Sequence, residues 1–217
     1  MKFSRLPLVY AMVRGFSELI LRLGHRLRVQ GLEHVPRQGG AVLVSNHSSF
    51  LDPMALAGAI RFRVLHFMAR DTLCHAPVIG WLMPRLQLIL IDRERGDVAA
   101  LKATLRLLKD GELVGLFPEG TRTSDGNLQP ARGGIGFLVS RARVPVIPVY
   151  VDGTYRALSR HHRFPRPARV TVTIGPPIPL DQLEALGTGR DALQGVADLI
   201  MERIASLRGP ASNPAGK

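Results

Sequence analysis

The apolar positions of the chain fall into two alternating patterns. Short apolar runs bounded by turn residues are typical of buried strands, and we expect strands at residues 41–45, 64–68, 87–91, 113–117, 146–151 and 170–174. Between these runs, apolar residues recur every three or four positions, as they do on the buried face of a helix. We expect helices that begin at 52–53 and that span 97–111, 133–141 and 191–207. This alternation predicts a single α/β domain with a mostly parallel, helix-covered sheet.

The N-terminal segment has a different pattern, because its few charged residues are regularly spaced. Arg14, Glu18 and Arg22 follow one another at intervals of four residues within a largely apolar stretch, Leu6 to Leu23. This spacing places the three charges on one face of a helix. We interpret residues 1–25 as an amphipathic helix that lies in a membrane interface; the alternative is a helix packed on the domain. The rest of the chain divides into a folded domain, 26–208, and a flexible tail, 209–217.

No segment of the sequence is apolar enough to cross a bilayer. A spanning helix needs about 20 apolar residues, whereas charge-free stretches such as Thr72 to Pro84 are much shorter. The first apolar run is interrupted by charges and lacks a small-residue cleavage site, so we expect no signal peptide. The single cysteine, Cys74, excludes an intramolecular disulfide framework and suits a reducing compartment. We therefore expect a protein attached to the cytoplasmic face of the cell membrane, peripherally or monotopically.

The charge balance narrows the classes of partner. The chain has a formal net charge of +12, with 25 Arg against 4 Lys. A basic surface attracts anionic lipid head groups, nucleic acid, or acidic cofactors and carrier proteins. Aromatic residues make up only 6%, and the sequence contains neither a helix-turn-helix nor an RNP-like strand, so we expect no nucleic-acid partner. We also expect no metal, because the histidines and carboxylates show no HExxH or similar ligand spacing.

The loop after the first long buried run contains the clearest candidate for chemistry. His47 and Asp52 are five residues apart, which would separate them by about 140° on a continuous helix, so they meet only if the chain turns between them. The predicted strand, loop and helix start supply that turn. An Asp that binds one imidazole nitrogen leaves the other free to take a proton from a substrate hydroxyl. The alternative is that Asp52 is only an N-cap and His47 a surface loop residue.

Two further strand-exit loops carry arginines. Arg93 lies between a predicted strand and the start of a helix, where a guanidinium and helix-start N–H groups favour a phosphate. In the next loop, Gly120 permits close backbone approach, and Thr121 with Arg122 offers a second phosphate site. The alternatives are a solvated ion pair of Arg93 with its acidic neighbours, and a turn that carries a surface arginine.

Four blocks of the sequence together resemble one known family. They are Asn46-His47 through Asp52, Ile91-Asp92-Arg93, Phe117-Pro118-Glu119-Gly120-Thr121-Arg122, and Val144-Pro145-Val146-Ile147-Pro148-Val149. In this order they resemble the glycerolipid and lysophospholipid acyltransferases, typified by 1-acylglycerol-3-phosphate acyltransferase, over roughly Gly31 to Pro179. The N-terminal segment is shorter and more charged than in members with spanning helices.

The resemblance implies a role for each block. His47 is expected to be the catalytic base and Asp52 its partner, within an acyltransferase domain at 26–208. Val144 to Val149 is expected to shape the acyl or acceptor pocket. The residues expected to bind substrate, and above all the acceptor phosphate, are Asn46, Arg93, Glu119, Gly120, Thr121 and Arg122.

The implied reaction moves a fatty acyl group from acyl-CoA or acyl-ACP to the free hydroxyl of 1-acylglycerol-3-phosphate, giving phosphatidic acid in phospholipid biosynthesis. We expect no cofactor beyond this co-substrate. The sequence has no Gly-x-Ser-x-Gly elbow, which favours direct transfer over an acyl-enzyme. The expected partners are a lysophospholipid acceptor, an acyl thioester donor, which includes acyl carrier protein, and an anionic membrane surface. The alternatives are acylation of another lysolipid, such as a lyso-ornithine lipid, and a non-catalytic membrane-binding module.

Overall fold

A seven-stranded sheet forms the centre of the molecule. The computed structural model describes residues 7–70, 77–91, 98–132, 134–187 and 189–209. The strand order is β1-β7-β6-β2-β5-β3-β4, and every neighbouring pair is parallel except β6 and β7. The strands are β1 (Arg28–Gln30), β2 (Ala41–Ser45), β3 (Leu65–Arg70), β4 (Ile89–Ile91), β5 (Leu113–Leu116), β6 (Val146–Asp152) and β7 (Thr171–Ile174). The predicted α/β fold with a mostly parallel sheet is confirmed.

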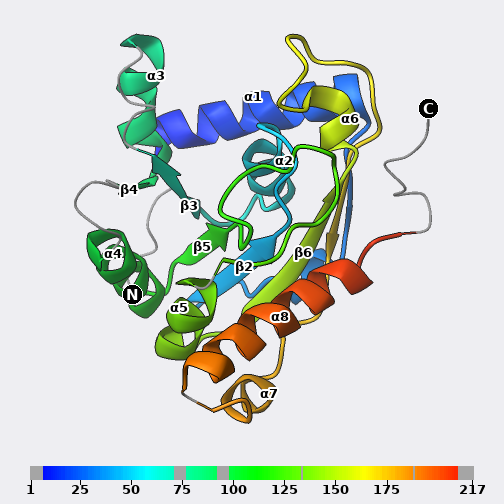
Figure 1. The fold of residues 1–217 in the computed structure, drawn as a ribbon. Coiled ribbons are helices and arrows are strands. Elements are labelled where there is room, and N and C mark those ends of the chain that lie inside the picture. The colour runs from blue at the N-terminus through cyan, green and yellow to red at the C-terminus, as the bar shows by residue number, and fades with distance from the viewer. Residues whose placement is uncertain (1–6, 71–76, 92–97, 133, 188, 210–217) are drawn as a thin grey trace.

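Helices cover both faces of this sheet (Figure 1). Helices α1 and α2 lie on one face, and α4, α5 and α8 on the other. The α-helices are α1 (Leu8–His25), α2 (Asp52–Ala59), α3 (Pro77–Leu82), α4 (Val98–Lys109), α5 (Gly134–Ala142), α6 (Thr154–Leu158), α7 (Leu180–Glu184) and α8 (Arg190–Ser206), with 3-10 turns η1 (Leu32–His34) and η3 (Met83–Leu86). The apolar core accordingly has two halves, one on each side of the sheet.

Most predicted elements are present, with differences at short segments and at one cap. The strand predicted at 41–45 coincides with β2, whereas β1, α6 and α7 were not predicted because each spans only three to five residues. Helix α2 begins at Asp52 itself, its N-cap is Leu51, and no side chain caps it. The interpretation of Asp52 as an N-cap is therefore wrong. The start of the helix predicted at 97–111 and most of the predicted tail, 209–217, lie outside the described residues.

Helix α1 has an apolar outer face. Tyr10, Ser17, Leu21 and His25 are buried against the domain. Arg14 and Glu18 also turn toward the domain, where they bond the backbone carbonyl and the guanidinium of Arg61 at the end of α2. The residues left exposed are large and apolar: Leu8, Met12, Phe16, Leu19, Ile20 and Leu23. Among the described residues, no helix combines the length and the hydropathy needed to span a membrane.

Three parallel central strands end at the same edge of the sheet. Strand β2 lies between β5 and β6, in register Val44 to Leu116 and Ser45 to Val149. The segments that leave these strands therefore meet above one edge, where ligands bind in open α/β sheets. This edge holds His47, the turn after β5, and the start of α6.

Candidate active site

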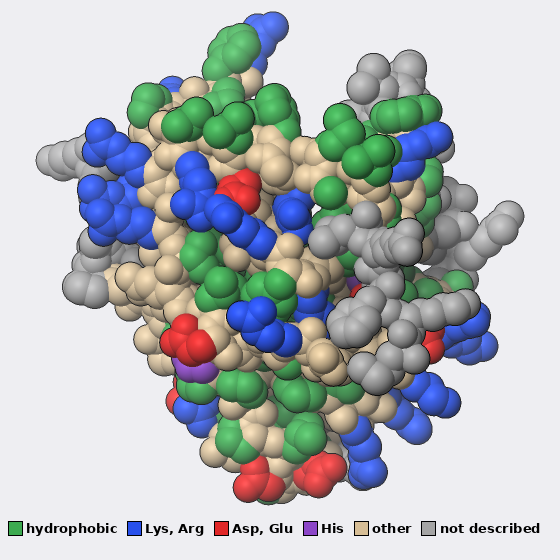
Figure 2. All heavy atoms as spheres, turned by 180° about the vertical axis from the view of Figure 1, so that it is seen from behind, with side chains coloured by type: hydrophobic (Ala, Val, Ile, Leu, Met, Phe, Trp, Pro, Cys, Tyr) green, Lys and Arg blue, Asp and Glu red, His purple; other side chains and the backbone are tan. Residues whose placement is uncertain are grey.

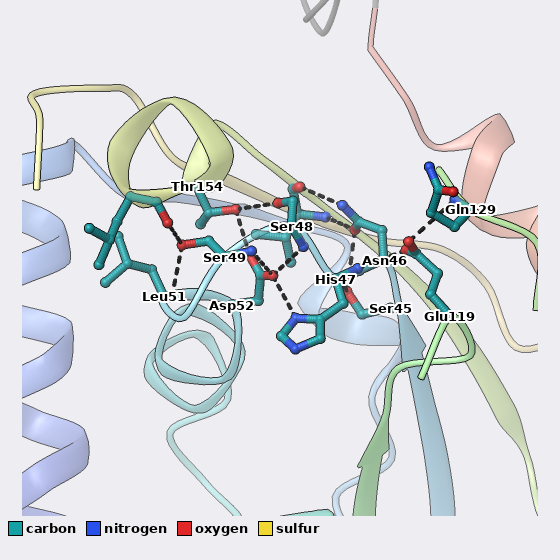
Figure 3. Close-up of polar contacts among 12 residues, drawn as sticks. Ser45, Asn46, His47, Ser48, Ser49, Leu51, Asp52, Glu119, Gln129 and Thr154 are labelled. Carbon is teal, nitrogen blue, oxygen red and sulfur yellow. Dashed lines mark hydrogen bonds and ion pairs between the residues drawn. The ribbon is translucent and has the colours of Figure 1, made fainter. Parts of the chain in front are cut away.

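His47 and Asp52 meet at this edge of the sheet. His47 follows β2, and Asp52 opens α2 after a tight turn. Nδ1 of His47 lies 3.0 Å from Oδ2 of Asp52 (Figure 3). The Asp52 side chain is fully buried, whereas the His47 side chain keeps 18% of its surface exposed. The predicted contact is thus present, and Nε2 of His47 has no hydrogen-bond partner among the described residues.

Hydrogen-bond donors enclose the Asp52 carboxylate. Oδ2 accepts the backbone N–H groups of Ser48 and Ser49, each at 2.7 Å, in addition to the imidazole. Oδ1 accepts the hydroxyl of Thr154 at 2.5 Å. A carboxylate in this position acts as an acceptor, so the proton shared with the imidazole belongs to Nδ1. The other ring nitrogen is then the neutral, proton-accepting one, as a general base requires.

The imidazole rests on an aromatic surface. The rings of His47 and Phe117 are stacked, with centroids 4.0 Å apart and an interplanar angle of 16°. Phe67 stacks behind Phe117 at 5.8 Å. These contacts fix the plane of the ring, because a stacked imidazole cannot tilt without losing contact on one side.

Comparison with known proteins agrees with this geometry. A family model described as Acyltransferase matches residues 26–152, more than half of the chain, and includes the loops after β2 and β5. The chain belongs to the acyltransferase family. This confirms the family that the four sequence blocks predicted. The match extends past the fourth sequence block and ends at Asp152, the last residue of β6.

Relatives of this acyltransferase share one name. The 1-acyl-sn-glycerol-3-phosphate acyltransferase of Bacillus subtilis is 26% identical over 92% of this chain and 96% of its own length. The alpha form from Mus musculus is 32% identical over 85% of this chain and 64% of the relative. The chloroplastic BAT2 enzyme of Brassica napus is 36% identical over 60% of this chain and 38% of the relative.

A solved structure has the same fold. The crystal structure of the 1-acyl-sn-glycerophosphate (LPA) acyltransferase PlsC from Thermotoga maritima matches with a TM-score of 0.77 at 23% identity. The match covers 94% of this chain and 81% of that one. The α/β architecture of this acyltransferase is therefore shared along nearly its whole length.

Glu119, which was expected to bind substrate, faces the protein interior and not open solvent. Its side chain is buried, and burial raises the pKa of Glu119 to about 7, against the lowering effect of hydrogen bonds from the backbone N–H groups of His47 and Gln129. Those bonds measure 2.9 Å to Oε1 and 3.2 Å to Oε2. The backbone N–H of Thr123 in turn donates to the carbonyl of His47 at 2.9 Å. Glu119 thus ties the turn after β5 to the catalytic loop.

Asn46 is likewise occupied by the protein itself. Its amide nitrogen donates to the carbonyl of Val151 at 2.9 Å, and its amide oxygen accepts the N–H of the same residue at 2.7 Å. This pair of bonds continues the β2–β6 ladder by one side chain. Its geometry indicates that Asn46 fixes the exit of β2 next to β6, and its expected binding of substrate stays a prediction.

Arg122, which was predicted to bind phosphate, has a guanidinium N–H donor that is free to bind a ligand. It lies over the ring of Phe50, 3.4 Å from the ring centroid, and its buried Nη1 has no hydrogen-bond partner within the described part of the chain. Burial lowers the pKa of Arg122, the nearby charge of Arg160 lowers it further, and Asp52 opposes both. Gly120 and Thr121, at the same turn, are exposed. An anion would complete this arrangement, because it satisfies the free donor and neutralises two like charges.

The remaining predicted residues divide into two cases. Arg93 lies outside the described residues. The block predicted to shape a pocket, Val144 to Val149, mostly forms β6, where Val146, Ile147 and Val149 are buried in the core. That block builds the sheet beside the catalytic loop, and its expected role in shaping the acyl or acceptor pocket stays a prediction.

Proposed function

We propose that this acyltransferase moves a fatty acyl group from a thioester donor to the free hydroxyl of 1-acylglycerol-3-phosphate, which gives phosphatidic acid. The shared name of its relatives supports the acceptor. The observation that carries the proposal is the 3.0 Å contact between Nδ1 of His47 and Oδ2 of buried Asp52. This contact leaves Nε2 as the base that a hydroxyl acceptor needs.

The reaction follows from these groups. The acceptor hydroxyl attacks the thioester carbonyl carbon, and Nε2 of His47 takes its proton. Asp52 stabilises the imidazolium that forms, as an oriented carboxylate does in a catalytic triad. The tetrahedral intermediate then collapses, the carbon–sulfur bond breaks, and the imidazolium returns the proton to the thiolate. The thioester is already activated, so no nucleophile from the protein is needed.

The acceptor phosphate is assigned to the Arg122 side of the site. The free Nη1 donor of Arg122 and the second positive charge of Arg160 favour a dianionic group over a neutral one. A lyso-ornithine lipid lacks a phosphate, so this arrangement favours the phosphorylated acceptor. The donor is a thioester of coenzyme A or of acyl carrier protein.

We place the enzyme at the cytoplasmic face of the membrane, held by α1. The exposed apolar face of this helix forms a ridge along one margin of the molecule (Figure 2). Trp81 on α3 is also exposed, with the guanidinium of Arg85 4.3 Å from its ring centroid. Tryptophan is enriched at membrane interfaces. The net charge of +12 attracts the same anionic surface.

A direct assay tests the proposed reaction. Purified protein is mixed with 1-acylglycerol-3-phosphate and either acyl-CoA or acyl-ACP, and free thiol and phosphatidic acid are measured together. We expect equal amounts of the two products, and no thiol when the acceptor is left out. The His47→Ala variant is the control. Product from a lyso-ornithine lipid but none from the phosphorylated acceptor would contradict the proposal.

A further inference from the structure

Thr154 contacts the catalytic pair from outside the four sequence blocks. It is fully buried at the start of α6, and its residue number is 102 beyond that of Asp52. The preceding Gly153 has a φ of +85°, and a Cβ there would lie 1.9 Å from the carbonyl oxygen of Arg169. Only glycine fits this turn. The backbone therefore fixes where the Thr154 side chain begins.

The hydroxyl of Thr154 has a defined direction. It donates to Oδ1 of Asp52 at 2.5 Å, so its single proton is used there. Its second contact, to Oγ of Ser48 at 3.0 Å, then requires Ser48 to be the donor. The result is a directed chain from Ser48 through Thr154 to one oxygen of Asp52, while the imidazole of His47 occupies the other (Figure 3).

We propose that Thr154 is a positioning residue, which holds the Asp52 carboxylate in the rotation that aims Oδ2 at the imidazole of His47. Oδ2 has three donors, but Thr154 is the one donor to Oδ1 among the described residues. Without it, Oδ1 is a buried acceptor with no partner, which favours rotation of the carboxylate or entry of water. The inference rests on the proposed function, because it assumes that the His47–Asp52 pair is the base.

The test removes the hydroxyl and keeps the shape. We expect Thr154→Val to lower kcat about 10- to 100-fold, the factor that corresponds to one hydrogen bond to a charged group, with little change in either KM. Thr154→Ser keeps the donor and should stay within about threefold of wild type. The matched control is Thr104→Val, another fully buried threonine, whose hydroxyl bonds only the Ala100 carbonyl of its own helix. Should the valine variant fail to fold, Thr154→Ala removes the same donor.

A second arm separates positioning from a general structural role. In an Asp52→Asn background, Thr154→Val should cause little further loss, because the hydroxyl acts through the carboxylate. An equal loss in both backgrounds would overturn the inference, as would a valine variant that keeps more than half of wild-type kcat. If Asp52→Asn alone were fully active, the assignment of the base would fail instead, and the role of Thr154 with it.

Discussion

The backbone N–H of His47 donates to Oε1 of Glu119 across 72 residues of sequence, at 2.9 Å. The carbonyl of His47 accepts from Thr123 in the same turn. Both backbone groups of the proposed base are therefore held by the segment that also presents Arg122. Movement of that segment on phosphate binding would therefore shift the backbone of His47, and with it the position of the imidazole.

Burial of Glu119 predicts a pH-dependent stability. Because its pKa is raised from 4.5 to about 7, the folded state binds more protons than the unfolded state between these values. Stability contributed by this group therefore falls as pH rises from about 4.5 to about 7, and is constant above that. The Tm of wild type relative to Glu119→Gln should decline across this window. Glu202→Gln, on the exposed side of α8, is the control. A Tm difference that stays flat with pH would contradict the raised pKa.

His47→Ala should remove nearly all turnover. General-base assistance is worth about 10²- to 10⁴-fold, and the loss should appear in kcat. Circular dichroism should show an intact fold, since the ring is partly exposed. More than about a tenth of wild-type kcat in a folded variant would show that His47 is not the base.

Asp52→Asn should lower kcat by a similar factor. An amide presents only one acceptor oxygen and can hold the imidazole in the wrong tautomer. This variant should also be less stable, because the buried donors around Asp52 bond a carboxylate that an amide replaces only in part. A change at an N-cap would have little effect, since Asn caps a helix about as well as Asp. Thermal unfolding measured beside kcat separates the two effects.

Arg122→Ala should raise the KM of the phosphorylated acceptor and leave that of the thioester nearly unchanged. Arg122→Lys should rescue poorly, because an ammonium group lacks the planar fork of a guanidinium. Arg141→Ala is the matched control, since Arg141 also lies over a phenylalanine ring but is itself exposed, near the end of α5. We expect the same acceptor effect for Arg93→Ala. A rise in the thioester KM alone would assign these arginines to the donor.

Substitution of the exposed face of α1 should release the protein from membranes. Phe16→Glu combined with Leu19→Glu places charges on side chains that are 65% and 54% exposed, so folding should survive. Sedimentation with anionic vesicles should fall sharply, and high salt should weaken wild-type binding without abolishing it. The control is Leu186→Glu, an exposed residue that follows α7 in the chain. Helix α7 lies at the opposite end of the molecule from α1 (Figure 1). Unchanged sedimentation of the double variant would move the membrane contact away from α1.

The local pattern of residues was enough to predict the strand at 41–45, the helical periodicity of α4 and the turn that joins His47 to Asp52. Each depends on neighbours within a few positions, where side-chain period and turn chemistry act directly. The same holds for the amphipathic character of α1. The sequence pattern did not show which face of α1 packs on the domain. In the structure Arg14 and Glu18 bond inward, to Arg61, and the large apolar side chains stay exposed.

Only the tertiary structure decided which polar residues brace the site and which remain free to bind. Asn46, Glu119 and Arg122 look equally polar in the sequence, yet two of them are buried on backbone groups and one keeps an unpaired donor. Thr154 gave no signal at all, because its partner Asp52 is 102 residues away. Residue type and spacing determine what a side chain can bond. Which partners it meets is set by the spatial order of the strands in the sheet, and that order depends on contacts between distant parts of the chain.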